Sequence, residues 1–154
     1  MAKETIHIQK AELHDVKYIH DLLKYYSEKN LILYRSMDEI TNALDQFWVA
    51  KKGKQIVGAI SYFDYGKKLK EIRSLAVSDS VKQGGLGSKL VRETIEYLHE
   101  HNKPKIFVLT YSPYFFEKNG FKIVPKDTLP EKIWKDCDAC KNKDHCTETA
   151  LIFA

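Results

Sequence analysis

A run of glycines that leads into a helical segment is the part of the chain whose residue types most clearly suggest chemistry. From Glu71 to Leu90 the chain reads as a strand, a short loop and then Gly84, Gly85 and Gly87 entering a helix. The first backbone N–H groups of a helix have no partner within it, and the helix dipole favours negative charge there. Because glycine lets a ligand approach the backbone closely, a phosphate or pyrophosphate is the natural ligand.

The spacing of these glycines fits neither of the two common nucleotide-binding loops. A Walker loop requires Gly-Lys-Ser/Thr, whereas Gly87 is followed by Ser88 and then Lys89. A dinucleotide fingerprint that begins at Gly85 requires a glycine where Leu90 stands. The glycines alone are therefore equally consistent with a purely structural turn.

Three cysteines near the carboxyl end form a second group of potentially reactive side chains. Cys137, Cys140 and Cys146, with His145 beside the last, offer thiolate and imidazole ligands for zinc. A structural zinc site usually joins two separated ligand pairs, but the second pair here would be two adjacent residues. We therefore favour reduced thiols or an opportunistic disulfide and assign no metal ligand. A metal- or redox-responsive interaction module is the alternative from another functional class.

Length and composition predict one globular domain that spans residues 1–154. The chain has 44% hydrophobic and 30% charged residues, as globular proteins do. Its longest apolar run, Ala150–Ala154, is too short to cross a membrane, and the amino terminus lacks a secretory pattern. We therefore expect a cytoplasmic protein, and in such a protein an odd number of cysteines argues against a disulfide framework. The net charge of +4 comes from scattered lysines and does not indicate nucleic-acid binding.

Hydrophobic periodicity predicts a mixed sheet with helices on its faces, an α+β arrangement that combines hairpins with crossovers. The predicted strands are Thr5–Ile8, Phe47–Ala50, Gln55–Phe63, Glu71–Val77, Lys105–Thr110, Phe121–Val124 and Thr149–Phe153. The predicted helices are Leu13–Ser27, Met37–Leu44 and the segment after the glycines, whose apolar stripe is Leu90, Val91, Thr94, Ile95 and Leu98. A further short helix is predicted to be capped by Ser112 and ended by Gly120. An exposed sheet edge would permit a homodimer.

Three motifs carry a resemblance to a known superfamily. Lys82-Gln-Gly-Gly-Leu-Gly87 resembles the acetyl-CoA pyrophosphate loop, Arg/Gln-x-x-Gly-x-Gly/Ala, of the GCN5-related N-acetyltransferases (GNAT). Leu75-Ala-Val77 is similar to the strand before that loop, and Phe115-Phe-Glu-Lys-Asn-Gly-Phe121 resembles the family's later helix-to-strand signature. Together with the order of elements, the resemblance covers nearly the whole chain. It implies a GNAT-like, mostly antiparallel sheet flanked by helices on both faces, with acetyl-CoA as the acetyl donor.

A second set of motifs narrows the resemblance. These motifs are Leu33-x-Arg35-Ser36, Glu71-x-x-Ser74-Leu-Ala-Val77, Phe107-Val-Leu-Thr110 and Leu129-Pro-Glu-Lys-x-Trp-Lys-Asp-Cys137. They resemble the short, single-domain N-acetylglutamate synthases of bacterial arginine biosynthesis. The resemblance implies direct acetyl transfer to the α-amine of L-glutamate in a ternary complex. A GNAT enzyme that acts on another small amine or on a protein amine is the alternative.

The same resemblance implies roles for individual residues. Glu71 stands where the superfamily often keeps the general base that takes a proton from the substrate ammonium. The tyrosine that commonly protonates the leaving thiolate is replaced by Phe116, which has no proton to give. Tyr111, Ser112 and Tyr114 are nearby substitutes, and Ser112 matches the synthases best. The implied acetyl-CoA-binding residues are Leu75, Ala76, Val77, Lys82, Gln83, Gly84, Gly85, Leu86, Gly87 and Ser88.

The two carboxylates of glutamate call for cationic groups in the site. Arginine grips a carboxylate with two parallel hydrogen bonds, which makes it a better clamp than lysine. Arg35 matches the substrate-contacting arginine of the synthases, although a surface ion pair is the more usual role of an arginine. Arg73 lies two residues from Glu71 on the same strand face and is a second candidate. Ser74 falls where family members contact substrate through the backbone.

Overall fold

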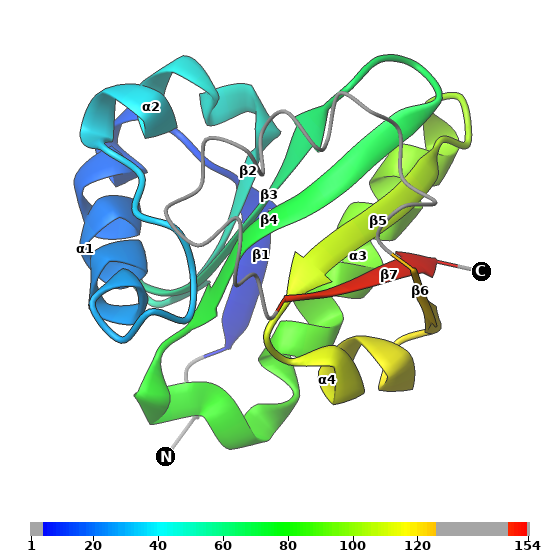
Figure 1. The fold of residues 1–154 in the computed structure, drawn as a ribbon. Helices are drawn as coiled ribbons and strands as arrows, with labels where there is room; N and C mark the ends of the chain where they lie inside the picture. Colours follow the sequence, from blue (N-terminus) through cyan, green and yellow to red (C-terminus); the bar gives the residue numbers. More distant parts are fainter. Residues whose placement is uncertain (1–4, 126–147, 154) are drawn as a thin grey trace. The chain divides into compact units, whose positions relative to one another are not determined.

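The computed structural model describes residues 5–125 and 148–153, except for the side chains of Lys82 and Gln83. The chain divides into two compact units, residues 1–104 and 105–154, whose elements Figure 1 labels in chain order. None of the helices in these described ranges is both long and apolar enough to cross a membrane.

Unit 1 is built on four strands that pair in the order of the sequence, each antiparallel to the next. They are β1 (Ile6–Lys10), β2 (Phe47–Lys52), β3 (Gln55–Asp64) and β4 (Leu69–Val77). The strands predicted at Phe47–Ala50 and Gln55–Phe63 are confirmed, and they form a hairpin in which Lys52 pairs with Gln55. At the turn itself Gly53 has a φ of +63°, which glycine adopts without steric cost.

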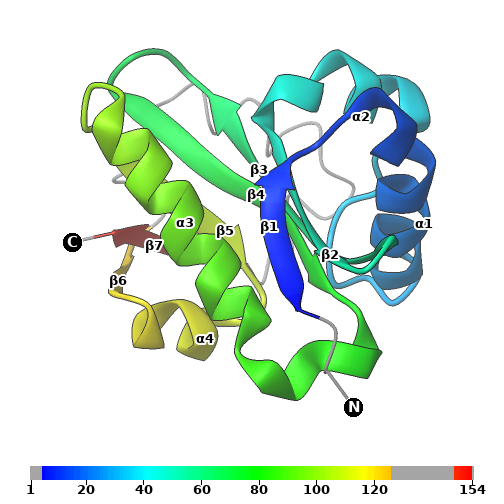
Figure 2. The same ribbon diagram turned by 180° about the vertical axis from the view of Figure 1, so that it is seen from behind.

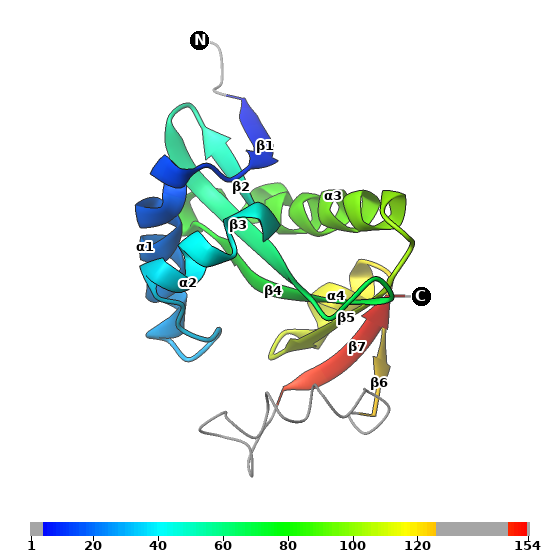
Figure 3. The same ribbon diagram turned by 90° about the horizontal axis from the view of Figure 1, so that it is seen from above.

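Helices cover both faces of this sheet (Figures 2 and 3). One face carries α1 (Val16–Ser27) and α2 (Met37–Asn42), and the other carries α3 (Leu86–Glu100). The remaining elements of unit 1 are the short 3₁₀ helices η1 (Leu13–Asp15), η2 (Leu44–Gln46) and η3 (Asp79–Gly84). The helix predicted from Leu13 therefore begins with a 3₁₀ turn, and the one predicted to Leu44 ends two residues earlier.

Each helix turns its apolar stripe toward the sheet, as the periodicity predicted. In α1 the buried residues are Val16, Ile19, Leu23 and Tyr26, and they belong to one cluster with Val49, Ala59 and Ala76 of the strands. In α3 all five predicted stripe residues are buried, together with Leu86. Gly58 of β3 allows this close packing, because a Cβ there would lie 3.1 Å from Leu90 Cδ1.

In its described residues, 105–125 and 148–153, unit 2 contains three antiparallel strands and one short helix. The strand β7 (Thr149–Phe153) pairs with both β5 (Lys105–Thr110) and β6 (Phe121–Val124), and α4 (Pro113–Lys118) precedes β6. The Phe116 ring is buried and meets the Phe121 ring edge-on at 5.3 Å. All four elements were predicted, and the fold class is confirmed as a mixed α/β fold with a mostly antiparallel sheet.

Replacing the buried Leu23 by alanine should lower the free energy of unfolding by about 2–5 kcal/mol, because it leaves a cavity between α1 and the sheet. Leu13→Ala is the matched control, since Leu13 is 69% exposed and its truncation should cost less than about 0.5 kcal/mol. Urea denaturation measures both variants. Equal losses would contradict the packing described for α1.

Candidate active site

A buried ion pair on β4 is the centre of the candidate site. Glu71 and Arg73 are two positions apart, so the strand directs both side chains to the face that α1 and α2 cover. Arg73 Nε donates to Glu71 Oε1 at 2.6 Å, and Glu71 is only 6% exposed. The short charge-assisted bond offsets part of the cost of removing the carboxylate from water. The structure thus brings together two of the residues singled out from the sequence.

Two aromatic residues of the β3–β4 hairpin complete this cluster. Phe63 pairs with Glu71 in register, and its ring lies 4.1 Å below the Arg73 guanidinium. The Tyr65 hydroxyl accepts a hydrogen bond from Arg73 Nη2 at 3.0 Å and donates one to Glu71 Oε1 at 3.3 Å. Neither aromatic residue was predicted from the sequence. The short gap between the strands predicted at Gln55–Phe63 and Glu71–Val77 was the available signal, because a turn there brings residue 65 back beside residue 71.

Burial raises the pKa of the Glu71 carboxyl above its ordinary value of 4.5. The positive charge and hydrogen bond of Arg73, the hydrogen bond of Tyr65 and the charge of Arg35 lower the pKa, but burial outweighs them. A carboxylate with a raised pKa binds a proton more tightly than an exposed one. Glu71 therefore combines a fixed position with the greater basicity that a general base needs.

Arg35 lies between α1 and α2, immediately before the first turn of α2. Ser36 caps that helix by accepting a hydrogen bond from the Glu39 backbone, and the Glu39 carboxylate accepts one from the Ser36 backbone in return. Arg35 Nη1 lies 3.5 Å from Glu39 Oε2, so the ion pair left open by the sequence is present. The pair is solvent-exposed and long, so it contributes little to stability.

A β-bulge interrupts β4 directly after the Glu71–Arg73 pair. The register moves from Ser61 opposite Arg73 to Ala59 opposite Ala76, so that two residues of β4 face one of β3. These two residues are the predicted Ser74 and Leu75. Ser74 has a φ of +53°, a strained value for a residue other than glycine. A bulge leaves a backbone group outside the ladder, free to meet a ligand.

The glycine run forms the start of α3, as predicted. Gly85 is the N-cap residue with a φ of +75°, and no side chain caps the helix. A Cβ built on either Gly84 or Gly85 would meet no atom within 4 Å, so the space beside the loop is open. The N–H groups of the first helical turn are suitably arranged to bind a phosphate. Leu86 turns its side chain into the core, so that only its backbone is available to a ligand.

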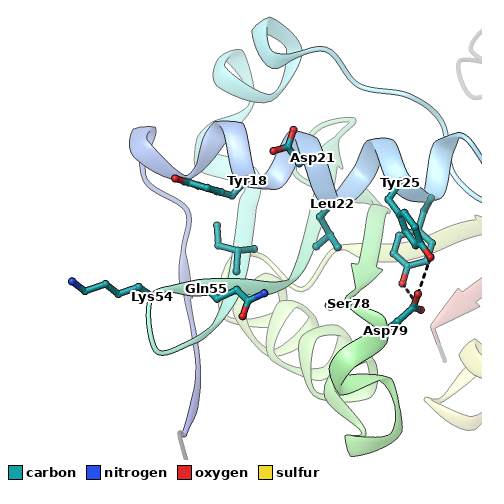
Figure 4. Close-up of a pocket in the computed structure, with 10 residues that line it drawn as sticks. Tyr18, Asp21, Leu22, Tyr25, Lys54, Gln55, Ser78 and Asp79 are labelled. Atoms are coloured by element: carbon teal, nitrogen blue, oxygen red, sulfur yellow. Dashed lines mark hydrogen bonds between the residues drawn. The ribbon is translucent and has the colours of Figure 1, made fainter.

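Two tyrosines of α1 hold the beginning of η3, the segment before the glycines. Tyr25 donates to Asp79 Oδ2 at 2.9 Å (Figure 4). Tyr26 lies 3.3 Å from Asp79 Oδ1 and also donates to the Val77 carbonyl. They border a groove of about 750 Å³. Its lining residues are Tyr18, Asp21, Leu22, Tyr25, Tyr26, Lys54, Gln55, Ile56, Ser78 and Asp79. None of the predicted catalytic or substrate-binding residues is among them.

Unit 2 holds the predicted candidates for protonating a leaving group. Ser112 occupies the N-cap position of α4, but its hydroxyl makes no capping hydrogen bond, and its N–H donates to Thr110 Oγ1 at 2.9 Å. Tyr111 is 39% exposed and Tyr114 is 71% exposed. The four cysteine-cluster residues, Cys137, Cys140, His145 and Cys146, lie outside the described residues.

Sequence comparison relates the chain to acetyltransferases. The profile of the Acetyltransferase (GNAT) family matches residues 12–121. An uncharacterized N-acetyltransferase of Chlorobaculum tepidum is 34% identical over 145 residues, which cover 94% of each chain. The amino-acid acetyltransferase of Mycobacterium tuberculosis is 26% identical over 89% of this chain and 79% of its own length. That of Neisseria meningitidis is 27% identical over 88% of this chain, which spans only 32% of that protein.

Solved structures show the same fold. The N-acetylglutamate synthase of Neisseria gonorrhoeae, complexed with coenzyme A and N-acetyl-glutamate, superposes with a TM-score of 0.88 at 23% identity. The match covers 98% of this chain and 35% of that one. A Mycobacterium tuberculosis protein in complex with CoA superposes with a TM-score of 0.84 at 21% identity, over 96% of this chain and 98% of that one. At such identities the likeness establishes the fold.

The raised pKa of Glu71 makes stability depend on pH. The folded chain holds the Glu71 proton more tightly than the unfolded chain does. The protonated carboxyl therefore adds to the free energy of unfolding in full below pH 4.5, and this addition is lost as pH rises through the raised pKa. Urea denaturation at a series of pH values should therefore show the wild type losing stability relative to Glu71→Gln above pH 4.5.

Glu39→Gln is a control for which stability should change with pH in the opposite direction. The backbone hydrogen bond of Ser36 and the charge of Arg35 lower the pKa of Glu39. The small contribution of ionised Glu39 to the free energy of unfolding should be present above pH 4.5 and be lost as pH falls through the lowered pKa. The assignment of the Glu71 pKa is wrong if the two variants show the same trend.

Proposed function

The chain belongs to the acetyltransferase (GNAT) family, and on this premise we propose that it transfers the acetyl group of acetyl-CoA to the α-amine of L-glutamate. The N-acetyltransferase activity follows from family membership, whereas glutamate as acceptor is our proposal. The observation that carries it is the buried Glu71–Arg73 pair, with the positive charge of Arg35 acting on the same carboxylate. A role in arginine biosynthesis, a cytoplasmic location and a homodimer belong to the same proposal.

Similarity to amino-acid acetyltransferases supports a free amino acid as the acceptor. Two such enzymes align with most of this chain, and one of them also matches over most of its own length. The ligands named for the Neisseria gonorrhoeae structure are coenzyme A and N-acetyl-glutamate, the products of the proposed reaction. Arginine side chains suit a dicarboxylate acceptor, because they bind carboxylates bidentately.

Glu71 serves as the general base in this proposal. An ammonium group cannot attack a thioester until it loses a proton, and Glu71 accepts that proton through a water molecule. The freed amine then forms a bond to the acetyl carbon while the bond from that carbon to sulfur breaks. The nitrogen is positively charged after the attack and must lose a second proton, while the coenzyme A thiolate must gain one. We propose that Ser112, with Tyr111 as the second candidate, gives its proton to the thiolate and recovers one from this nitrogen through water. Glu71 then releases the first proton to solvent. Substrate and product are thereby balanced in atoms and charge.

The loop between β4 and α3 suits the pyrophosphate of coenzyme A. The uncapped N-terminus of α3 supplies N–H donors, and the open space beside Gly84 and Gly85 leaves room for phosphate oxygens. We propose backbone contacts from residues 82–88 and from the β4 residues Leu75, Ala76 and Val77. The backbone freed by the bulge at Ser74 and Leu75 is suited to receive the thioester oxygen as it becomes negative.

Release of free thiol from acetyl-CoA, measured as each acceptor is added, tests this function. L-glutamate should give selective turnover, while aspartate, glutamine, ornithine and spermidine should give little. Glutamine, ornithine and spermidine lack the second carboxylate, and aspartate carries it one methylene closer to the amine. Faster turnover with another amine would be consistent with acetyltransferase activity but would overturn glutamate as the acceptor.

Arg35→Ala tests the proposed carboxylate clamp. Loss of a charge-assisted contact to the substrate should raise the KM for glutamate about 10- to 100-fold, with a smaller change in kcat. Arg92→Ala is the matched control, because Arg92 is an exposed arginine of α3 and should leave both constants unchanged. Steady-state kinetics at saturating acetyl-CoA measure both variants. An unaltered KM in Arg35→Ala would remove Arg35 from the substrate site.

A further inference from the structure

The Tyr65 hydroxyl occupies a distinctive place in the Glu71 cluster. It accepts a hydrogen bond from Arg73 Nη2 at 3.0 Å and donates to Glu71 Oε1 at 3.3 Å, so it bridges the two members of the buried ion pair. Arg73 Nε bonds directly to the same oxygen at 2.6 Å. Within the described parts of the chain, both hydrogen bonds to this carboxylate therefore end on Oε1.

We propose that Tyr65 is a positioning residue, which together with Arg73 occupies Oε1 and leaves Oε2 of Glu71 as the oxygen that receives the substrate proton. The inference rests on the proposed role of Glu71 as general base. A carboxylate has two equivalent oxygens, and a base works efficiently only when one is held toward the proton it takes. Two donors on one oxygen fix the plane of the carboxylate and distinguish its two oxygens.

The hairpin holds Tyr65 rigidly enough for this task. Its backbone N–H donates to the Leu69 carbonyl at 3.1 Å, which closes the turn between β3 and β4. Its ring packs against the Phe63 ring, with the centroids 4.7 Å apart. The Phe63 ring also supports the Arg73 guanidinium. Turn, ring and guanidinium therefore form one unit around the carboxylate.

The charged and titratable groups that act on Glu71 come from three segments. Arg73 lies on its own strand, Tyr65 lies in the β3–β4 turn, and Arg35 lies before α2. All three favour the ionised carboxylate, whereas burial opposes it. Removing the Tyr65 hydroxyl deletes one of these stabilising contacts and leaves both arginines in place. The carboxyl should then bind its proton more tightly.

The experiment is a ¹³C NMR titration of the side-chain carboxyl of Glu71 in the full chain labelled with [¹³C]glutamate. Its resonance is identified by its absence in Glu71→Gln. In Tyr65→Phe the Glu71 pKa should rise by about 0.5 to 1 unit. The acid limb of the pH profile of kcat/KM should move upward by the same amount, while the KM for acetyl-CoA stays unchanged.

Tyr62→Phe is the matched control. It deletes the same hydroxyl oxygen from a tyrosine three residues earlier in the chain. The ring of Tyr62 faces Tyr97 of α3 on the other side of the sheet. It should change neither the titration nor the pH profile. An unshifted Glu71 titration in Tyr65→Phe, or a thermal destabilisation with an unchanged pH profile, would overturn the proposal. The NMR readout needs no turnover, so failure of the glutamate assignment would appear separately in the thiol assay.

Discussion

Burying a carboxylate constrains much of unit 1. The desolvation of one charge costs several kcal/mol unless hydrogen bonds and an opposite charge replace the lost water. Glu71 meets that requirement with Arg73 from its own strand and Tyr65 from the preceding turn. Because the two partners come from different positions of the β3–β4 hairpin, both contacts depend on the register of that hairpin. The pKa of Glu71 stays raised, since burial outweighs these contacts.

The same strand changes character within a few residues. Before Ser74 it follows regular pairing and holds the ion pair, and after the bulge it leads into η3 and α3. The bulge stores backbone strain at Ser74, which the surrounding antiparallel pairing offsets. Strain of this kind is often found at functional sites, where a backbone group outside the strand pairing can bind a ligand. The location between the proposed base and the proposed phosphate loop fits that use.

The proposed phosphate loop is held from α1, on the face of the sheet opposite α3. Tyr25 and Tyr26 of α1 reach Asp79 at the start of η3, while α3 begins beyond Gly85. The core that buries α1 thus also fixes where the loop starts. This arrangement explains how a short, glycine-containing segment keeps the N-terminus of α3 open.

The sequence by itself determined the elements and the family resemblance. Local periodicity and turn residues gave the strands, the helices and the stripe of α3, because these depend on neighbours along the chain. It also placed Glu71 beside Arg73, since alternation along one strand is a local rule. Only the tertiary structure decided that Tyr65 bridges this pair, that Phe63 supports it and that Ser74 begins a bulge. These features depend on the register between strands and on burial, which residue spacing along one chain does not specify.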